Sequence, residues 1–467
     1  MDNIILLTDG YKVSHHNMLP PNTEYVYSYL ESRGGEVPLT CFFGLQYILM
    51  KYLAGPVVTR EKIDYAEKYF AKYFGNTKVF NKAGWEYILE KHNGFLPLEI
   101  FAVPEGTVLP SHLPLVTILN TDPNCAWLTD YVETIIMQVW SPITVASRSL
   151  QSKKSILKYL KVTGTPETID FKLHDFGYRG VSSNETAGLA GAAHLVHFKG
   201  SDTLAANDLI LKYYENGNLD KMPSFSIPAS EHSTITSWGR ESEVEAFENI
   251  LDNYPEGLVA CVSDSFDIEK ACTELWGGVL KDKVLNRKGT LVVRPDSGNP
   301  ITMPETVISA LAKKFGGQRN SKGYYVLPDQ VRVIQGDGIE DYRTIEDILS
   351  FLLERGWSAD NIAFGSGGGL LQKINRDTMK FAIKCSAVNI KGVWHEVYKE
   401  PKDDKFKASK RGLVTTYLTS EGKYVSGTLP NASTNSETTP FLNKVFSNGR
   451  VFTTSFSEIR DRAAKFL

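Results

Sequence analysis

Features that would mark a membrane protein, a disulfide-rich protein or a nucleic-acid-binding protein are missing from this sequence. No run of about 18 or more uncharged apolar residues occurs, and the first residues, MDNIILL, carry an acid where a secretory signal carries basic residues. The 5 cysteines are scattered without a CxxC pair, which argues against a disulfide framework and a zinc site. Lysine and arginine total 51 against 54 aspartate and glutamate, so we expect no nucleic-acid or membrane partner. These absences lead us to expect a cytoplasmic protein with reduced cysteines.

A repeated strand design is what the sequence does contain. The stretch LVVRPDSGNP at 291–300 begins with an apolar run and ends in Arg294, Asp296 and a glycine turn. The same design, a short apolar run that breaks into Gly, Ser, Asp, Arg or His, recurs at 171–180, 224–232, 258–267, 331–338 and 361–369. Segments with helical periodicity lie between these runs, of which 342–357 is the clearest. Alternating strands and helices favour a parallel (β/α) barrel whose polar loops all open on one face.

The two ends of the chain differ from this central repeat. The first part combines a helical segment around 60–74 with strands expected within 97–109 and 113–121. Further along, the stretches 413–429 and 450–459 have the pattern of hairpins. With 467 residues and 42% hydrophobic content, two domains are the natural expectation. We predict a discontinuous α+β domain formed by 1–148 with 386–467, and an α/β barrel catalytic domain at 149–385.

A glycine-rich loop, GSGGG at 365–369, follows the apolar run NIAF and precedes a helix expected over 370–379. Successive glycines let the backbone approach a ligand closely, and the free N–H groups of a helix's first turn attract anions. This pattern favours a phosphate site, although a flexible turn between a strand and a helix would have the same glycines. Arg376, inside the expected helix, could add a positive charge.

Acidic residues at strand ends form a second pattern. Asp264, Asp296 and Asp337 each follow an apolar run, so parallel strands would bring them to one mouth of the barrel. Their like charges repel each other there, and convergence on sugar hydroxyls or on Mg²⁺ would offset that cost. Each carboxylate taken alone could equally be a turn residue without a ligand.

The remaining loops add aromatic, basic and titratable groups. Phe176 and Arg179 suit a planar ring beside a phosphate, or a core aromatic next to a surface arginine. His232, preceded by Glu231, is either a catalytic group or a turn residue. Asp202 precedes an expected helix and could bind a ligand or cap that helix. Together these groups describe a site for a phosphorylated ribose and a heteroaromatic base.

Longer motifs carry a resemblance to a known family. In chain order they read TDGYKVSHH, HDFGYRGVSSNETAG, FKGSDT, IPASEHSTITSWG, SDSFDI, RPDSGNP, IQGDG and FGSGGGLLQK. With these motifs the chain resembles the nicotinamide phosphoribosyltransferases of the type II phosphoribosyltransferase family. The resemblance implies an irregular (β/α) barrel, a discontinuous β-rich α+β domain built from both chain ends, and a homodimer with shared active sites. It also implies transfer of the 5-phosphoribosyl group of phosphoribosyl pyrophosphate to nicotinamide, giving nicotinamide mononucleotide for NAD salvage.

The same resemblance implies roles for individual residues in binding the substrates. Nicotinamide would stack between Phe176 and Tyr11 of the partner subunit. Asp202 would accept a hydrogen bond from the carboxamide and would repel nicotinate, and Arg294 and Asp296 would hold the carboxamide and ribose region. The other substrate-binding positions that the resemblance implies are Asp9, Arg179, Gly336, Asp337, Gly367, Gly368 and Arg376.

Two cofactors are implied in the same way. Mg²⁺ would bind the pyrophosphate group rather than protein side chains. ATP would act as a co-substrate that phosphorylates His232, with Asp264 orienting the imidazole and Glu231 beside it. Arg33 and Lys384 would surround the triphosphate or pyrophosphate. The chain after Ala387 is the least similar part, which bears on the coupling to ATP.

Three other functions stay open at this point. A nicotinate phosphoribosyltransferase would share the fold, and Asp202 argues against it. A binding module without turnover is opposed by a set of residues that is intact here, namely Arg179, His232, Asp264, Arg294 and Asp296. A (β/α) barrel glycosidase could use two of the carboxylates, but the glycine-rich loop and the arginines at strand ends do not suit neutral sugars.

Overall fold

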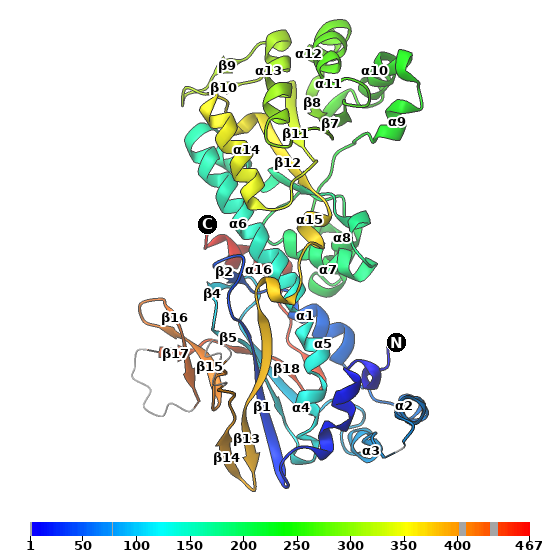
Figure 1. Ribbon diagram of the computed structural model, residues 1–467, viewed down its shortest axis with the longest axis vertical. Helices are drawn as coiled ribbons and strands as arrows, with labels where there is room; N and C mark the ends of the chain where they lie inside the picture. The colour runs from blue at the N-terminus through cyan, green and yellow to red at the C-terminus, as the bar shows by residue number, and fades with distance from the viewer. Residues whose placement is uncertain (1, 77, 401–407, 430–437) are drawn as a thin grey trace. The chain divides into compact units, whose positions relative to one another are not determined.

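The computed structural model describes residues 2–76, 78–400, 408–429 and 438–467 (Figure 1). The chain divides into two compact units. Unit 1 comprises Met1–Ser147, Tyr213–Asn216 and Ile374–Phe466. Unit 2 comprises Arg148–Lys212, Gly217–Lys373 and Leu467. Unit 1 therefore draws on both the N-terminal and the C-terminal parts of the chain, and residues 374–385 belong to it.

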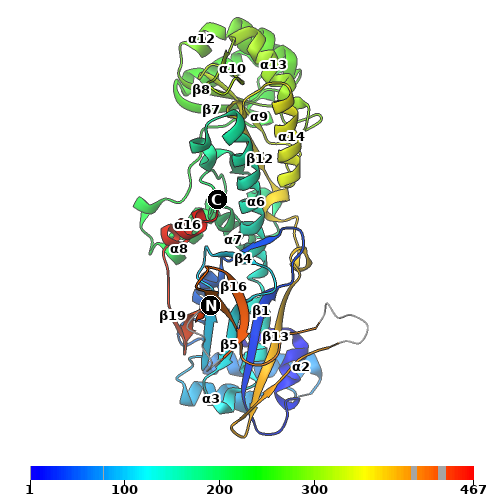
Figure 2. The ribbon, with the colours of Figure 1, turned by 90° about the vertical axis from the view of Figure 1, so that its left-hand side faces the viewer.

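A seven-stranded antiparallel sheet organises unit 1. Its order is β14 (Val393–Glu396), β13 (Phe381–Ile390), β1 (Thr23–Ser32), β5 (Pro114–Asn120), β3 (Leu98–Ala102), β18 (Asn443–Ser447) and β19 (Arg450–Val451). Strand β13, late in the chain, pairs with β1, near its start, and the two lie side by side in Figures 1 and 2. This pairing confirms the discontinuous β-rich domain.

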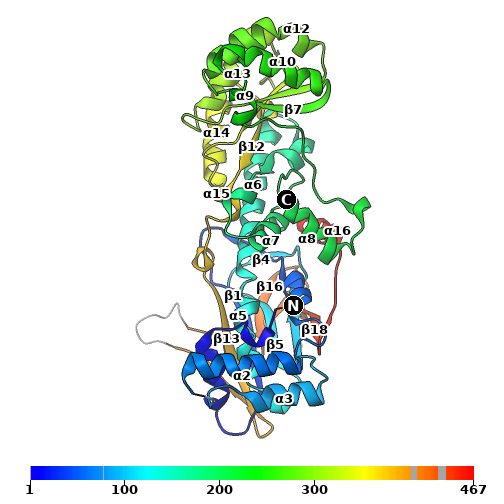
Figure 3. The same cartoon turned by 90° about the vertical axis from the view of Figure 1, so that its right-hand side faces the viewer.

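Helix α2 (Arg60–Phe74) shows how the sequence sets a helix of this unit. The Thr59 side chain caps its first turn, and Ile63 and Phe70 are buried on one face at helical spacing. Helix α3 (Lys82–Lys91) lies beside it (Figure 3). The other α-helices and strands of this part are α1 (Leu45–Ile48), α4 (Leu128–Tyr131), α5 (Glu133–Met137), β2 (Leu39–Cys41), β4 (Val108–Pro110), β15 (Val414–Thr419), β16 (Tyr424–Thr428) and β17 (Thr438–Pro440).

The segment 450–459 differs from the hairpin that its sequence suggests. β19 ends at Val451, and helix α16 (Phe456–Ala464) begins five residues later. Ser455 accepts a hydrogen bond from the Glu458 N–H, while the Glu458 carboxylate accepts one from the Ser455 N–H. This reciprocal capping box starts a helix, so the hairpin prediction is wrong beyond Val451.

Unit 2 is built on a five-stranded parallel sheet. Its order is β6 (Leu173–Asp175), β12 (Ile362–Ser366), β11 (Val331–Gln335), β8 (Lys288–Arg294) and β7 (Glu256–Val262). Single parallel bridges extend the pairing from both edges, because Asp175 pairs with Ser201, Gly200 with Phe225, and Ala229 with Ala260. The sheet thus closes on itself, which confirms the irregular (β/α) barrel.

The stretch 224–232 accounts for part of this irregularity. The sequence predicted a regular strand here. The structure differs, because Phe225 and Ala229 form single bridges to different neighbours. Pro228 between them has no N–H to donate, although its carbonyl accepts a hydrogen bond from the Ala260 N–H at 2.9 Å.

Helices cover the outside of the barrel. Phe247 of α10 (Glu243–Asn253), Leu311 of α13 (Met303–Phe315) and Leu349 of α14 (Tyr342–Glu354) share one buried core with the strands. The helix predicted over 342–357 is confirmed as α14, with Ile345, Ile348, Leu349 and Leu352 buried. The remaining helices are α6 (Trp140–Thr163), α7 (Asn184–His194), α8 (Leu204–Tyr214), α9 (His232–Thr236), α11 (Ile268–Lys270), α12 (Lys281–Leu285) and α15 (Gly368–Leu371).

A second, smaller apolar cluster fills the inside of the barrel. Ala260, Val292 and Ile334 come from β7, β8 and β11, and Phe176 packs against them. Their sequence neighbours point to the outer core, because successive side chains of a strand face opposite sides. Phe176, which follows β6, therefore closes the interior at the carboxyl ends of the strands.

Two further expectations concern the whole chain. All 5 cysteines are free, and only Cys385 is not fully buried, as expected for packed thiols. Within the ranges that the structure describes, none of the helices has both the length and the apolar character needed to cross a bilayer.

Candidate active site

A cavity of about 1000 Å³ opens at the carboxyl ends of the barrel strands. Each wall comes from a loop that directly follows a strand or bridge of the barrel, so the polar loops do share one face. The lining residues are Phe176, Tyr178, Arg179, Gly180, Val181, Asp202, Ala229, Ser230, Glu231, Thr234, Arg294, Asp296, Gly336, Gly367 and Gly368. Most of the predicted site residues of unit 2 are therefore brought together, while their chemical roles stay predictions.

His232 begins helix α9, and its imidazole lies between the carboxylates of Asp264 and Asp296. Nε2 is 3.1 Å from Oδ1 of Asp264, and Nδ1 is 3.8 Å from Oδ2 of Asp296. The His232 ring is 45% exposed, whereas the Asp264 side chain is 3% exposed. The imidazole is thus accessible to a ligand, while the buried Asp264 carboxylate fixes its orientation.

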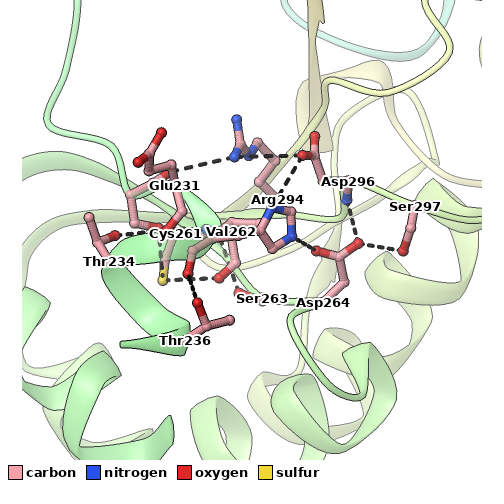
Figure 4. Close-up of polar contacts among 12 residues, drawn as sticks. Glu231, Thr234, Thr236, Cys261, Val262, Ser263, Asp264, Arg294, Asp296 and Ser297 are labelled. Atoms are coloured by element: carbon pink, nitrogen blue, oxygen red, sulfur yellow. Dashed lines mark hydrogen bonds and ion pairs between the residues drawn. The ribbon is translucent and has the colours of Figure 1, made fainter. Parts of the chain in front are cut away.

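Asp264 is held as an anion. Burial favours its neutral form, but the Ser297 hydroxyl, the Asp296 N–H and His232 outweigh burial and hold the pKa of Asp264 below its ordinary value. Oδ2 accepts hydrogen bonds from the Asp296 N–H at 2.9 Å and from the Ser297 hydroxyl at 2.5 Å (Figure 4). Oδ1 is left for Nε2 of His232, so Nδ1 is the nitrogen that faces away from the buried acid.

Arg294 and Asp296 stand at the end of β8. The Arg294 side chain is 16% exposed, and its Nη2 lies 3.5 Å from the Ser230 carbonyl oxygen and 3.9 Å from Oδ2 of Asp296. Its Nε is buried and makes no hydrogen bond with any residue of the described ranges. A guanidinium with so few partners can bind a carbonyl or anionic group of a ligand.

The outer rim of the cavity carries a weakly coupled pair of charges. Nη1 of Arg179 is 4.0 Å from Oε2 of Glu231, and both side chains are largely exposed. The Ser233 hydroxyl also donates to Glu231. Exposed ion pairs contribute little energy, so Arg179 can leave Glu231 for an anionic ligand at little cost.

Asp202 lies deeper and is paired with two residues that the sequence analysis did not single out. Nε2 of His174 is 3.1 Å from Oδ1 of Asp202, and the Ser226 hydroxyl donates to the same oxygen. The carboxylate is thus engaged in the cavity wall, and it does not cap helix α8, the alternative considered above. Burial raises the pKa of Asp202, but His174, Ser226 and Arg294 reverse this and hold it below the ordinary value. Side chains two positions apart in an extended chain face the same side. This alternation could have indicated His174, two residues before Phe176, as a residue that faces the cavity.

Glycines make room for Phe176 and for a second hollow. A side-chain carbon at Gly365 would lie 2.1 Å from the Phe176 ring, so only glycine fits there. Gly180 and Gly368 approach each other backbone to backbone, with 3.0 Å between a side-chain carbon built on Gly180 and the Gly368 nitrogen. The second hollow, about 550 Å³, is lined by Gly180, Gly336, Asp337, Gly338, Ile339, Glu340, Gly367, Gly368, Gly369, Gln372 and Lys373. Asp337 and the predicted glycine loop therefore meet in this hollow.

The helix expected after the glycine loop is much shorter than predicted. Helix α15 spans only Gly368–Leu371, and a few residues later the Asn375 side chain caps a separate turn. Arg376 is not inside it and instead begins a 3₁₀ turn at Arg376–Thr378 in unit 1. The cation that does line the hollow is Lys373, whose Nζ lies 2.5 Å from Oε2 of Glu340, and the sequence analysis did not name it.

The other predicted site residues belong to unit 1. Asp9 accepts a hydrogen bond from the Thr134 hydroxyl at 2.8 Å, and Tyr11 is 62% exposed. Nε of Arg33 is 2.9 Å from Oε1 of Glu31. Burial lowers the pKa of Lys384, the charge of Glu133 raises it, and the nearby positive charges of Arg33, Lys399 and Arg376 lower it further. These four cations, which we call the cationic group, form a suitable surface for a polyanion.

Carboxylates that could hold a metal ion occur in both units. Asp202 and Asp296 offer oxygen atoms on the cavity wall, the ligand type that Mg²⁺ prefers. In unit 1, and within the described part of the chain, the ligand atoms of His92, Asp122 and Cys125 lie within 4.8 Å of one another. Asp122 there already accepts hydrogen bonds from Tyr87 and Asn124.

Comparison with known proteins gives a consistent set of matches. The family model described as "Nicotinate phosphoribosyltransferase (NAPRTase) family" matches residues 171–450, and that of the "Nicotinamide phosphoribosyltransferase, N-terminal domain" matches residues 3–100. The chain is 46% identical over 457 residues to a nicotinamide phosphoribosyltransferase of Xanthomonas campestris pv. campestris, covering 97% of this chain and 96% of the relative. A nicotinamide phosphoribosyltransferase of Acinetobacter baylyi is 31% identical, with 98% and 96% covered.

Solved structures show the same fold at low sequence identity. A nicotinate-nucleotide pyrophosphorylase from Pyrococcus furiosus superposes with a TM-score of 0.62 at 16% identity, covering 99% of this chain and 95% of that chain. The human nicotinic acid phosphoribosyltransferase superposes with a TM-score of 0.54 at 14% identity, covering 98% and 93%. At these identities the likeness concerns the fold alone.

Proposed function

Since this chain belongs to the nicotinate phosphoribosyltransferase (NAPRTase) family and is a phosphoribosyltransferase, we propose that it uses nicotinamide as its base. It would transfer the 5-phosphoribosyl group of phosphoribosyl pyrophosphate to nicotinamide and release nicotinamide mononucleotide and pyrophosphate, a step of NAD salvage. The observation that carries the choice of base is the carboxylate of Asp202 in the cavity wall.

Asp202 favours an amide over an acid for electrostatic reasons. An ionised carboxylate accepts a hydrogen bond from the N–H₂ of nicotinamide, whereas it repels the carboxylate of nicotinate. Partial desolvation raises the pKa of Asp202, but His174, Ser226 and Arg294 outweigh it and hold that pKa below its ordinary value. At neutral pH the residue is therefore an acceptor only, which supports nicotinamide rather than nicotinate as the substrate.

The other groups of the cavity fit the two substrates. Phe176 offers a ring face for stacking on a pyridine, and Arg294 can donate to the carboxamide oxygen. Gly180, Gly367 and Gly368 line the second hollow, where the N–H groups of Gly367 and Gly368 could donate to a 5′-phosphate. Arg179, at the exposed rim, is placed to meet pyrophosphate. Lys373 would add positive charge beside the glycine loop.

The transfer needs a nucleophile, a leaving group and stabilisation of positive charge. The pyridine nitrogen is neutral and carries a lone pair, so no protein base is required for its attack on C1 of the ribose. As the new C–N bond forms, the bond from C1 to pyrophosphate breaks and its electron pair leaves with pyrophosphate. Asp296 can stabilise the positive charge that develops at C1. Mg²⁺, held by pyrophosphate and through water by Asp296, would neutralise charge on the leaving group.

We also propose that ATP stimulates the reaction through His232. Asp264 engages Nε2, so the lone pair of Nδ1 is available to attack the γ-phosphorus of ATP, with ADP as the leaving group. The exposure of the ring supports access by a nucleotide. The cationic group of unit 1 (Arg33, Arg376, Lys384 and Lys399) would bind the triphosphate or pyrophosphate.

A homodimer with shared active sites completes this proposal. Tyr11 of a second copy would stack on the base opposite Phe176, which the 62% exposure of Tyr11 supports. Mixing a Tyr11→Ala chain with a Phe176→Ala chain tests it, because a heterodimer would contain one site with both rings. Recovery of activity above that of either variant supports shared sites. Activity no higher than the average of the two variants contradicts them.

Substrate competition and an Asp202 variant test the choice of base. We expect the Asp202→Ser chain to accept nicotinate much better than the original chain does, because the repelling charge is gone. Unchanged selectivity would contradict the role of Asp202. Product formation from nicotinate alone would instead favour a nicotinate phosphoribosyltransferase, and no product from either base would favour a binding module.

A further inference from the structure

Helix α6 places a buried cation, Arg148, behind the second hollow. The residue is 7% exposed and is not part of the lining of that hollow. Its Nη1 donates to the carbonyl oxygens of Gly369 at 3.2 Å and of Lys373 at 3.3 Å, and its Nη2 donates to the carbonyl oxygen of Glu340 at 3.0 Å. One guanidinium therefore holds the backbone of two segments that line the hollow, the loop after β11 and the segment after β12.

Other contacts join the same two segments. The Ser366 hydroxyl donates to the Ile339 carbonyl oxygen at 2.6 Å, and both residues are buried. A side-chain carbon at Gly369 would lie 3.0 Å from Cα of Glu340, so the segments meet backbone to backbone. The ion pair of Lys373 with Glu340 is largely exposed and contributes little energy. The buried, charge-assisted hydrogen bonds of the guanidinium should contribute most among these links.

This arrangement favours an anion in the hollow. A carbonyl oxygen repels a phosphate group, whereas a backbone N–H attracts it. Because three carbonyl oxygens are bound by Arg148, which lies outside the lining, they are kept from turning toward an anion in the hollow. The guanidinium charge is also buried, so water and salt screen its attraction for an anion less than at the surface.

We propose that Arg148 is a positioning residue for the 5′-phosphate, because it holds the loop after β11 and the segment after β12 in the arrangement that binds this group. Arg148 acts through the backbone of these segments and does not touch the ligand. This inference rests on the proposed function, since it assumes that the second hollow takes the 5′-phosphate. Loss of the guanidinium should weaken binding of the 5′-phosphate while leaving the binding of the base and of pyrophosphate unchanged.

Ribose 5-phosphate and pyrophosphate are suitable probes, because each carries only one of the two phosphate parts of phosphoribosyl pyrophosphate. Calorimetry with the full chain would measure Kd for each. Arg148→Met keeps a long side chain but has neither donors nor charge. We expect its Kd for ribose 5-phosphate to rise roughly 10-fold or more, with Kd for pyrophosphate little changed. In steady-state kinetics KM for phosphoribosyl pyrophosphate should rise, while KM for nicotinamide and kcat change little.

Arg148→Lys tests whether the planar fork of the guanidinium matters in addition to its charge. A single ammonium group cannot reach both segments with the same geometry. Its Kd for ribose 5-phosphate should lie between the values of the unsubstituted chain and of Arg148→Met. Urea unfolding would show whether each variant folds, and Arg148→Lys carries the test if Arg148→Met does not fold.

Lys153→Met is a matched control in the same helix. The Lys153 side chain is buried, and its Nζ donates to the His197 carbonyl oxygen and to Asp170, none of which lines the hollow. This variant also removes a buried cation that binds a backbone carbonyl. It should lower the free energy of unfolding without changing Kd for ribose 5-phosphate.

The outcomes separate the role of Arg148 from the proposed function. The inference is overturned if folded Arg148→Met binds ribose 5-phosphate as tightly as the unsubstituted chain, if its affinity for pyrophosphate falls by the same factor, or if Lys153→Met has the same effect. An unsubstituted chain that binds no ribose 5-phosphate would overturn both the phosphate site and this inference. If that chain forms no nicotinamide mononucleotide, yet Arg148→Met weakens its binding of ribose 5-phosphate, only the proposed function fails.

Discussion

Gly365→Ala is the substitution whose consequence follows most directly from the geometry of the cavity. A methyl group at this position would lie 2.1 Å from Cε2 and 2.4 Å from Cδ2 of Phe176. Carbon atoms in contact normally lie about 3.5–4.0 Å apart, so the ring must move by roughly 1.4 Å or more. The barrel interior leaves little space, because Ala260, Val292 and Ile334 pack against the same ring. The alanine variant should therefore displace Phe176 from the wall of the cavity.

The size of the effect can be estimated from the stacking that is lost. Stacking of a base on an aromatic side chain contributes about 1–3 kcal/mol, which corresponds to a roughly 5- to 150-fold rise in KM for nicotinamide. The value of kcat should change less, because the groups around C1 of the ribose stay in place. Overpacking should also cost about 1–3 kcal/mol of folding free energy, which urea unfolding would measure.

Steady-state kinetics of the single and double variants test this reasoning. Phe176→Ala alone should raise KM by a similar factor, and adding Gly365→Ala to it should cost nothing more, because the ring that the methyl group strikes is absent. Gly278→Ala is the control, since a methyl group there would lie 3.5 Å from the Thr273 carbonyl, an ordinary contact. An unchanged KM in Gly365→Ala, or the same effect with and without Phe176, would refute the steric explanation.

Two further predictions concern ATP and pH. His232→Ala should abolish the gain in rate that ATP produces, while the ATP-independent rate falls less. The measurement is the rate of nicotinamide mononucleotide formation with and without ATP. Full stimulation by ATP in the variant would rule out the phosphohistidine. Glu105 is buried in unit 1, where burial raises its pKa to about 7 against the effects of the Gln46 N–H and the Tyr214 hydroxyl. The folded state then binds a proton more tightly than the unfolded chain, so this group's contribution to stability falls by about 3 kcal/mol as the pH rises from 4.5 to 8. Glu105→Gln should remove that fall, which the free energy of unfolding measured against pH would show. If the two chains lose stability in parallel as the pH rises, the raised pKa of Glu105 is contradicted.

Much of the fold could be predicted because its buried strands have a recognisable sequence pattern. Buried parallel strands read as short apolar runs that end in polar loops, as at 291–300 and 331–338. What the pattern could not show is how the barrel closes. Closure depends on single bridges at Gly200, Phe225 and Ala229, which are too short to leave a periodic signal. Near the C-terminus a usable signal was present, because Ser455 and Glu458 have the spacing of a capping box.

The site residues could be predicted where a charged side chain stands at the end of a buried strand, because such a side chain has few other roles there. Asp202, Arg294 and Asp296 meet at one cavity because parallel strands bring their carboxyl ends together. His174 was missed because it lies within the strand rather than after it. Lys373 was missed because α15 ends at Leu371 and Asn375 caps a separate turn at Arg376–Thr378, so Lys373 lines the hollow while Arg376 lies outside the helix.

One competition experiment tests the central claim, that the family fold in this chain serves nicotinamide. Equimolar nicotinamide and nicotinate would compete for limiting phosphoribosyl pyrophosphate with Mg²⁺, and chromatography would separate the two mononucleotides. We predict that nicotinamide mononucleotide dominates, and that its share falls in the Asp202→Ser variant. A dominant nicotinate product from the unsubstituted chain would contradict the claim.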